Sequence, residues 1–261
     1  ILTSFMVEAL FIKFTKKLNT KKTLKTLRGS FSVIPGLFLA LILPINTPYL
    51  LVLFGALCAT LFGKLLFGGF GQNIFNPALI GYLFISVAYS SLLGSYFSLS
   101  EMDAIATATP LTNLANLNYI GTYESLVGVY GNLFNFLVGT IPGTIGEVSK
   151  ILIIFAFIYL SVTKTIKWKI PLFYVTTVFI ITYVVGYKLG LGIWYPLFQI
   201  MSGGLLFGAV FMATDPVTSP ITPFGQILYG IFLGILTTCL RFLTSYPEGV
   251  LTSILFMNML V

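Results

Sequence analysis

The residues with the clearest chemical potential in this sequence are Asp103 to Leu111, which read DAIATATPL. This polar segment of small residues stands between long apolar stretches and ends in a threonine, Thr109, directly before Pro110. A proline forces the residue before it into an extended conformation, so Thr109 is expected to be extended. The segment has two interpretations: an ordinary loop of small residues that a proline ends, or an attachment site that uses the threonine hydroxyl.

Asp103, Ala108 and Thr109 follow a pattern that resembles the flavinylation motif of a known family. That family contains the D subunit of the Rnf-type ion-translocating electron-transport complex and the B subunit of sodium-translocating NADH:quinone reductase. In it, an aspartate stands six residues before a threonine, an Ala-Thr pair closes the motif, and FMN is joined through its phosphate to the threonine hydroxyl. Ala106 and Thr107 depart from the pattern, because the family usually has Ser or Thr and then Gly there. The resemblance implies covalent FMN on Thr109.

Three further blocks resemble the same family. They are the loop from Gly68 to Pro77, the segment GTIPGTIGEVS from Gly139 to Ser149, and the segment from Gly203 to Pro220, which contains MATDPVTSP. The resemblance covers residues from about 29 to 261. Within the family the chain is more similar to the Rnf-type D subunit, because it is compact and lacks long extensions.

The loop before Pro77 carries three amide side chains at membrane depth: Gln72, Asn73 and Asn76. Irregular polar backbone occurs at that depth only where protein buries it or water lines it. Asn76 before Pro77 is typical of a helix N-cap, with proline at the first helical position. We therefore predict that Asn76 mainly caps a helix and that Gln72 and Asn73 face a ligand, with a simple tight turn as the alternative.

Two acidic residues in these blocks, Glu147 and Asp215, are candidates for ion handling or coupling. Each also has a structural interpretation. Glu147 stands where a helix of residues 148–163 is expected to begin, and a carboxylate is favourable at that end of the helix dipole. Asp215 before Pro216 is typical of a helix start, yet an aspartate within a membrane is costly and usually faces a cavity or a partner. The sequence leaves both interpretations open.

The composition defines a polytopic membrane protein. Of 261 residues, 57% are hydrophobic and 8% charged, and the mean hydropathy is +1.00, whereas soluble domains have about 25% charged residues. The chain has no histidine, and its two cysteines are not in metal-ligand spacing, so no metal site is predicted. It begins at Ile1 inside an apolar run, without an initiator methionine, and we expect the N-terminus to be truncated.

Short apolar runs interrupted by glycine and proline occur in both halves of the chain. The run from Phe31 to Leu43 is too short for the roughly 20 residues that span a bilayer, and the pattern of half-helix, polar break and span recurs from Gly204. The family itself is built of two inverted repeats. We predict one all-α integral membrane domain over residues 1–261, with about 8–10 membrane segments: repeat one about 29–97, a flavin-bearing loop about 98–124, and repeat two about 139–261.

Basic residues predict the topology. Seven of the fourteen lie between Lys13 and Arg28, in what is expected to be a loop, and a second cluster lies at residues 164–169. By the positive-inside rule both loops are cytoplasmic, which accounts for the formal charge of +7 without nucleic-acid binding. The helix of residues 148–163 then enters from outside, and residues 125–138 are too short to span. The Thr109 loop is therefore expected on the extracytoplasmic side of a bacterial cell membrane.

The resemblance implies a membrane subunit of an ion-translocating oxidoreductase that passes electrons across or along the membrane, coupled to sodium or proton translocation. It also implies a second, non-covalent flavin such as riboflavin, and it implies neighbouring Rnf-type subunits and a flavinyl-transferring enzyme as partners. The flavin would supply the redox chemistry and the protein its position. One alternative is a channel or transporter for a small polar solute with urea-channel-like architecture, because broken helices occur there too. Another is a flavin-less structural subunit, motivated by Ala106 and Thr107.

Overall fold

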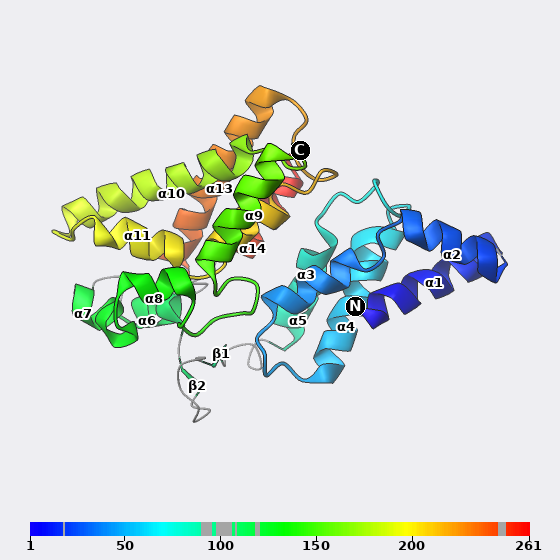
Figure 1. Cartoon of the computed structure of the whole chain (residues 1–261), viewed down its shortest axis with the longest axis horizontal. Helices are drawn as coiled ribbons and strands as arrows, with labels where there is room; N and C mark the ends of the chain where they lie inside the picture. The colour runs from blue at the N-terminus through cyan, green and yellow to red at the C-terminus, as the bar shows by residue number, and fades with distance from the viewer. Residues whose placement is uncertain (18, 90–95, 98–105, 108, 118–120, 245–248) are drawn as a thin grey trace. The chain divides into compact units, whose positions relative to one another are not determined.

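The computed structural model describes residues 1–17, 19–89, 96–97, 106–107, 109–117, 121–244 and 249–261 (Figure 1). The chain divides into two compact units, Ile1–Gly94 and Ser95–Val261, called unit 1 and unit 2 below. In the described ranges both units are helical apart from one pair of two-residue strands. The predicted all-α class is therefore confirmed.

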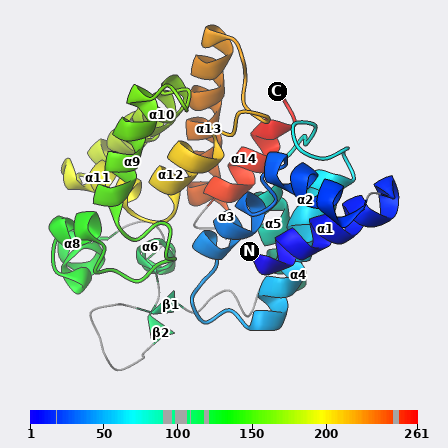
Figure 2. The same ribbon diagram turned by 45° about the vertical axis from the view of Figure 1, so that its right-hand side comes forward.

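Unit 1 is a group of short helices. Its elements are α1 (Leu2–Lys16), α2 (Thr20–Gly29), α3 (Ile34–Ile42), α4 (Tyr49–Thr60), the π-helical segment η1 (Leu61–Leu65) that continues α4, and α5 (Pro77–Ala88). Helices α3, α4 and α5 pack on one another (Figure 2). Glycines allow α4 and α5 to approach closely: a Cβ at Gly81 would lie 2.5 Å from the Gly55 carbonyl oxygen. Small residues at such contacts are typical of helix packing in membranes.

The basic segment of unit 1 differs from the predicted loop, because most of it is the helix α2. Thr23 and Leu27 are four residues apart and buried, whereas Lys21, Lys22 and Lys25 are exposed. A helix presents residues four apart on one face, so the segment buries that face and leaves its charges outside. The residues of this segment therefore form an amphipathic helix and not a loop.

A buried ion pair joins α1 to η1. Lys64 Nζ donates to Glu8 Oε2 at 2.7 Å and to the Ser30 carbonyl oxygen at 2.6 Å, and both charged side chains are buried. A buried charge is costly unless it is paired and hydrogen-bonded, and here both conditions are met. No pattern in the sequence indicated this pair. The π-helical turn around Lys64 is itself a feature that occurs often at functional positions.

Unit 2 contains the longest helices. Its elements are β1 (Tyr96–Phe97), β2 (Ala106–Thr107), α6 (Pro110–Asn116), α7 (Tyr123–Leu126), the 3-10 turn η3 (Gly128–Tyr130), α8 (Leu133–Val138), α9 (Lys150–Val162), α10 (Lys169–Lys188), α11 (Trp194–Met201), α12 (Leu205–Phe207), the π-helical segment η4 (Gly208–Met212) that continues α12, α13 (Pro223–Leu243) and α14 (Val250–Asn258). The strands pair antiparallel, with Tyr96 opposite Thr107 and Phe97 opposite Ala106.

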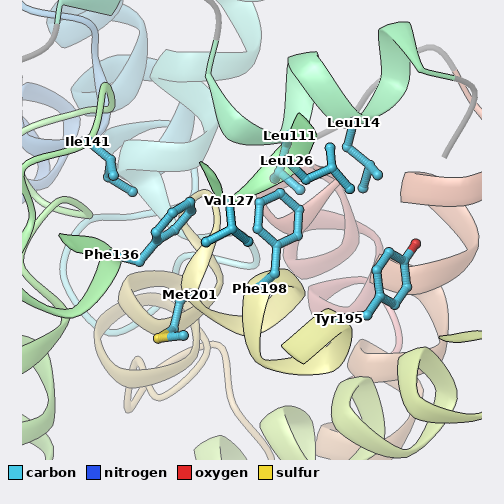
Figure 3. Packing of buried hydrophobic residues seen from close by; sticks show 9 residues of the cluster. All are labelled: Leu111, Leu114, Leu126, Val127, Phe136, Ile141, Tyr195, Phe198 and Met201. Atoms are coloured by element: carbon cyan, nitrogen blue, oxygen red, sulfur yellow. The ribbon is translucent and has the colours of Figure 1, made fainter. Parts of the chain in front are cut away.

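The hydrophobic core of unit 2 packs the short helices α6, α7 and α8 against α11. Nine buried side chains form it: Leu111, Leu114, Leu126, Val127, Phe136, Ile141, Tyr195, Phe198 and Met201 (Figure 3). Leu111 and Leu114 come from α6, whereas Phe198 comes from α11, and the rings of Phe136 and Phe198 lie 5.6 Å apart. Burial of an aliphatic or aromatic side chain contributes about 1.5–3 kcal/mol, so this cluster holds α6 in place.

Two described helices are long and apolar enough to cross a membrane, α10 and α13, which pack against each other. The number rises to four if two bent helix pairs each form one broken span: Lys21–Gly29 with Ile34–Ile42, bent by 53°, and Trp194–Met201 with Leu205–Met212, bent by 64°. Three further apolar helices in the described ranges have 10–17 residues, short of the roughly 20 needed to span: Tyr49–Leu65, Pro77–Ala88 and Lys150–Val162. The described residues thus provide fewer candidate spans than the 8–10 segments predicted.

Both predicted half-helices are short helices that begin after a sharp bend, α3 in unit 1 and α12 with η4 in unit 2. Helix α4 and the segment η1 form one continuous helix from Tyr49 to Leu65, which Pro48 precedes and whose last turn is π-helical. The inverted relation of the two halves stays a prediction.

Candidate functional site

Thr109 is the N-cap of α6. Its backbone is extended, with φ −64° and ψ 156°, as expected for a residue before proline. Its hydroxyl oxygen accepts the Thr112 N–H at 3.2 Å and lies 2.8 Å from the Thr112 hydroxyl. The side chain is 3% exposed, and the residue begins a helix, whereas the sequence predicted a loop over about 98–124. The cap and the packing of α6 together hold the hydroxyl in one position.

The other motif residues are described in part. Asp103 and Ala108 lie outside the described residues, and the predicted roles of both stay predictions. The two positions that depart from the family pattern, Ala106 and Thr107, form strand β2. The backbone just before the attachment residue is therefore extended and paired with β1.

A narrow pocket lies beside Thr109 within unit 2, and the space inside it is too small for a water molecule. It is lined by Thr109, Pro110, Ile141, Pro142, Gly143, Glu147, Val148, Lys150 and Gly203. The pocket is therefore a place where α6, the turn before α9 and the bend after α11 meet, and it is not a cavity shaped for a ligand.

Glu147 lines this pocket but does not cap α9. Its Oε1 accepts the Thr144 N–H at 3.0 Å, and its own N–H donates to the Thr144 carbonyl oxygen at 3.1 Å, so it closes a turn before the helix. The helix begins at Lys150 with Ser149 as N-cap, two residues later than predicted. The other carboxylate oxygen lies 3.0 Å from where a Cβ on Gly204 would stand. The Glu147 carboxylate is therefore directed toward the bend between α11 and α12.

Lys150 is the residue of this pocket that sequence analysis missed. It is 1% exposed, and its ammonium donates to the carbonyl oxygens of Glu147 and of Gly203, the latter at 3.2 Å. The contact with Gly203 joins the start of α9 to the bend after α11. No signal in the sequence distinguished it, because a lysine at the end of a membrane helix commonly extends to the membrane interface, as Lys169 at the start of α10 could.

Arg241 on α13 reaches the same bend from another side. Its guanidinium donates to the Gln199 carbonyl oxygen at 2.6 Å, to Gln199 Oε1 at 3.2 Å and to the Ser202 carbonyl oxygen at 3.3 Å. The last carbonyl groups of a helix have no partner within it, and a cation at that end is also favoured by the helix dipole. Arg241 thus satisfies the end of α11, and it does not line the pocket beside Thr109.

The three amide residues predicted in the Gly68–Pro77 loop belong to unit 1. Asn76 caps α5, since its Oδ1 accepts the Ala78 N–H at 3.0 Å and Pro77 opens the helix, as predicted. Asn73 is buried, and its Nδ2 donates to the Phe75 carbonyl oxygen at 3.1 Å. Gln72 is exposed. The ligand-facing role of Gln72 and Asn73 stays a prediction.

Asp215 is not a helix N-cap. Helix α13 begins at Pro223 with Thr222 as its cap, and Asp215 lies in the preceding turn, where its Oδ1 accepts the Val217 N–H at 3.1 Å. The sequence suggested a helix because Asp-Pro favours turns and helix starts alike. Burial raises the pKa of the Asp215 carboxyl, while hydrogen bonds within the turn and the charge of Lys167 act to lower it.

Lys167 holds the turn of Asp215 against the loop between α9 and α10. Its ammonium donates to the Ser219 carbonyl oxygen, to the Ser219 hydroxyl and to the Pro220 carbonyl oxygen at 3.3, 3.1 and 3.0 Å. Burial lowers the pKa of Lys167, and the Asp215 carboxylate raises it. Each of the two opposite charges therefore stabilises the ionised form of the other.

Long apolar helices, sharply bent helix pairs and few charged residues define an all-helical membrane protein. The chain belongs to the NQR2, RnfD, RnfE family, whose model matches residues 1–261. The predicted family is confirmed.

Three relatives of this chain are D subunits of oxidoreductase complexes. It is 38% identical over 261 residues to the D subunit of the proton-translocating ferredoxin:NAD(+) oxidoreductase complex of Clostridium ljungdahlii, covering 99% of this chain and 78% of that protein. It is 35% identical over 258 residues to the D subunit of the Na(+)-translocating ferredoxin:NAD(+) oxidoreductase complex of Acetobacterium woodii, covering 99% and 75%. It is 31% identical over 284 aligned positions to the D subunit of the ion-translocating oxidoreductase complex of Haemophilus influenzae, covering 94% and 77%.

Proposed function

We propose that this chain is a membrane subunit of an ion-translocating electron-transport complex and carries FMN joined through its phosphate to Thr109. The observation that carries the proposal is the family match over the whole chain together with relatives named as D subunits of such complexes. One of these relatives is named as part of a proton-translocating complex and another as part of a Na(+)-translocating complex. The proposal therefore includes either ion. Such a subunit passes electrons on and completes no reaction alone.

The geometry at Thr109 suits an ester on the hydroxyl. An esterified oxygen still accepts a hydrogen bond, so it can keep the Thr112 N–H contact that caps α6. It no longer has a proton to donate, and the neighbouring Thr112 hydroxyl then becomes the donor of that pair. The flavin supplies one- and two-electron chemistry when bound, and the protein holds its phosphate at a fixed point of unit 2.

A second flavin without a covalent bond, such as riboflavin, belongs to the same proposal. Of the three amide residues in the Gly68–Pro77 loop, Asn76 uses its oxygen to cap α5 and Asn73 uses its amino group within the loop. Gln72 is exposed and is therefore the residue best able to contact such a ligand. The other partners are the remaining subunits of an Rnf-type complex and an enzyme that transfers the flavin.

A denaturing gel tests this function directly. The purified protein is separated in detergent, which removes non-covalent flavin, and the gel is viewed under ultraviolet light before staining. We expect a fluorescent band at the mass of the chain. A polar-solute channel gives no band and no copurifying redox subunits. A flavin-less structural subunit gives no band but purifies with the other subunits of the complex.

We propose further that the Thr109 segment lies on the extracytoplasmic side of a bacterial cell membrane. Asn116 at the end of α6 is exposed and offers a labelling position close to Thr109. In a variant with Asn116→Cys, and with Cys58 and Cys239 replaced by serine, we expect a membrane-impermeant maleimide to react in whole cells. Labelling that needs broken cells would reverse the topology.

Asp215 is proposed to act in ion coupling through its charge. Asp215→Asn retains an oxygen that accepts the Val217 N–H, but it removes the charge beside Lys167. A carboxylate that remains half-buried despite the cost of burial usually has a function. We expect this variant to assemble and to hold flavin while ion uptake driven by electron transfer in vesicles is lost. Normal ion uptake with Asp215→Asn would mean that Asp215 only stabilises the turn through its hydrogen bond to the Val217 N–H.

A further inference from the structure

We propose that α2 lies at the membrane surface and that its exposed basic face binds the headgroups of anionic phospholipids. Four exposed side chains form this surface, which is called the basic face below: Lys21, Lys22, Lys25 and Arg28. The basic face belongs to unit 1, so the proposal does not depend on a flavin at Thr109. It also decides how α2 is placed, because α2 and α3 are one of the two bent pairs that could form a broken span.

The basic residues of unit 1 have almost no acidic residues to balance them. Glu8 is the one acidic residue in the sequence before Glu101, and its carboxylate is already paired with Lys64 in the buried ion pair. Seven basic residues lie between Lys13 and Arg28. A concentration of like charge destabilises a compact structure through its own repulsion. An anionic surface outside the chain would therefore supply the charge that unit 1 lacks.

The spacing of the basic face places its charges on one side of a helix. Lys21, Lys25 and Arg28 are separated by four and then three residues, so they are neighbours on the surface of α2. The buried residues Thr23 and Leu27 lie on the opposite side. Like charges at this spacing destabilise a helix in water. A row of phosphate headgroups beside them replaces that repulsion with attraction.

Leu24 favours a lipid surface over an acidic protein as the partner. It lies three residues after Lys21 and four before Arg28, and its side chain is 50% exposed. At a membrane surface the leucine side chain can enter the acyl layer, while the long lysine and arginine side chains keep their charges among the headgroups. An acidic protein surface offers the negative charges without an apolar layer directly beneath them.

The chain on both sides of α2 exposes large apolar side chains. Leu10 and Phe14 are exposed on α1, which packs against α2, and Phe31 and Val33 are exposed after α2 ends. In a membrane protein such apolar side chains face the acyl chains of lipids. The basic segment between them then lies where the apolar surface ends, which is the level of the headgroups.

A broken span made of α2 and α3 is the competing placement of the same residues. It would carry the four charges of the basic face into the hydrocarbon layer, where basic side chains are rare and costly and usually face the interior of a helix bundle. The four side chains are exposed in unit 1 and do not face its interior. The charges therefore favour α2 at the surface, with α3 as a short helix that follows it.

The test places a fluorophore at the end of α2 and measures which lipids contact it. Gly29 is the last residue of α2, and a Cβ there would meet no atom within 4 Å, so Gly29→Cys is expected to fold normally. Cys58 and Cys239 are replaced by serine, and the complex that contains the labelled chain is purified and reconstituted into vesicles. The vesicles contain brominated phosphatidylglycerol, which is anionic, or brominated phosphatidylcholine, which is zwitterionic, because bromine quenches a fluorophore that it contacts.

We expect the anionic lipid to produce half of the maximal quenching at about a tenfold lower mole fraction than the zwitterionic lipid, because several cations attract its headgroup together. Bromine close to the headgroup should quench more strongly than bromine near the end of the acyl chains. Salt at about 0.5 M screens exposed charges and should remove most of the preference for the anionic lipid.

Charge variants show whether the basic face causes the preference. Lys21→Glu/Lys25→Glu should make the two lipids quench equally, whereas Lys21→Arg/Lys25→Arg keeps both charges and should keep the preference. The matched control is Lys164→Glu/Lys169→Glu, which changes the net charge by the same amount but lies in unit 2. It should also keep the preference. An equal loss in this control would reject the basic face as the binding surface.

Three results with the labelled parent protein would overturn the inference. Equal quenching by the two lipids means that α2 does not select anionic headgroups. No quenching by either lipid means that α2 faces water or is covered by another protein, such as an acidic partner. Stronger quenching by the deeper bromine means that α2 is part of a span. If Lys21→Glu/Lys25→Glu does not assemble, the salt titration of the parent protein replaces it, and a preference that salt leaves unchanged is equally contrary to the proposal.

Discussion

Thr109→Asn is expected to abolish the fluorescent band while the protein remains folded. Asparagine caps a helix about as well as threonine, so its oxygen can accept the N–H that Thr109 now accepts from Thr112. It has no hydroxyl, and a phosphoester cannot form. Thr109→Ala should also lose the band, but with about 0.5–2 kcal/mol less stability, because the cap is lost too. The measurement is in-gel flavin fluorescence together with thermal unfolding.

Two controls accompany the Thr109 variants. Thr109→Ser keeps both the hydroxyl and the cap and should retain the band. Thr107→Ala, at the position in β2 where the family usually has glycine, should retain it as well, since Thr107 lacks an aspartate six residues before it. A band that survives Thr109→Asn and disappears with Thr107→Ala would move the attachment to Thr107.

Lys64→Met is expected to destabilise unit 1 by about 3–5 kcal/mol, the cost of leaving a buried charge without its partner. Lys64 Nζ contacts both Glu8 and the Ser30 carbonyl oxygen, so the substitution leaves the Glu8 carboxylate buried beside apolar atoms. The effect should be visible as a lower midpoint of denaturant-induced unfolding in detergent micelles. The contact joins α1 to η1, and α1 should separate first.

The double variant Glu8→Gln/Lys64→Met isolates the electrostatic part of this effect. Both charges are absent from it, so most of the lost stability should return. Lys21→Met, which removes an exposed charge from α2, should change stability by less than about 0.5 kcal/mol. If Lys64→Met unfolds at the same denaturant concentration as Lys21→Met, the ion pair is not what holds α1 in place.

The features that could be predicted from the sequence depend on residues a few positions apart. Pro110 restricts Thr109 to an extended backbone. Asn76 and Pro77, which are adjacent in the sequence, provide the N-cap and the first residue of α5. The all-helical membrane class follows from composition, since few charged residues remain among long apolar runs. The family blocks are likewise local strings of residues. Each of these properties is present before the chain packs.

Predictions from short sequence patterns were wrong where one pattern is compatible with two local structures. Asp215-Pro216 favours both a turn and a helix start, and the chain forms a turn because α13 begins at Pro223. Glu147 stands close to a helix start and closes a turn that precedes it. The basic residues before Arg28 fit a loop by charge alone, yet α2 forms because Thr23 and Leu27 find a surface to bury against.

The sequence by itself determined the class of protein, its family and the residue proposed to bear the flavin, because these depend on composition and on short strings of residues. Tertiary structure decided which charges meet. Lys150 reaches the Gly203 carbonyl oxygen across 53 positions, and Lys64 reaches Glu8 across 56. Burial of Thr109 likewise depends on the packing of α6 on α11. Contacts between residues so far apart form only when helices pack, and no periodicity or spacing along the chain encodes them.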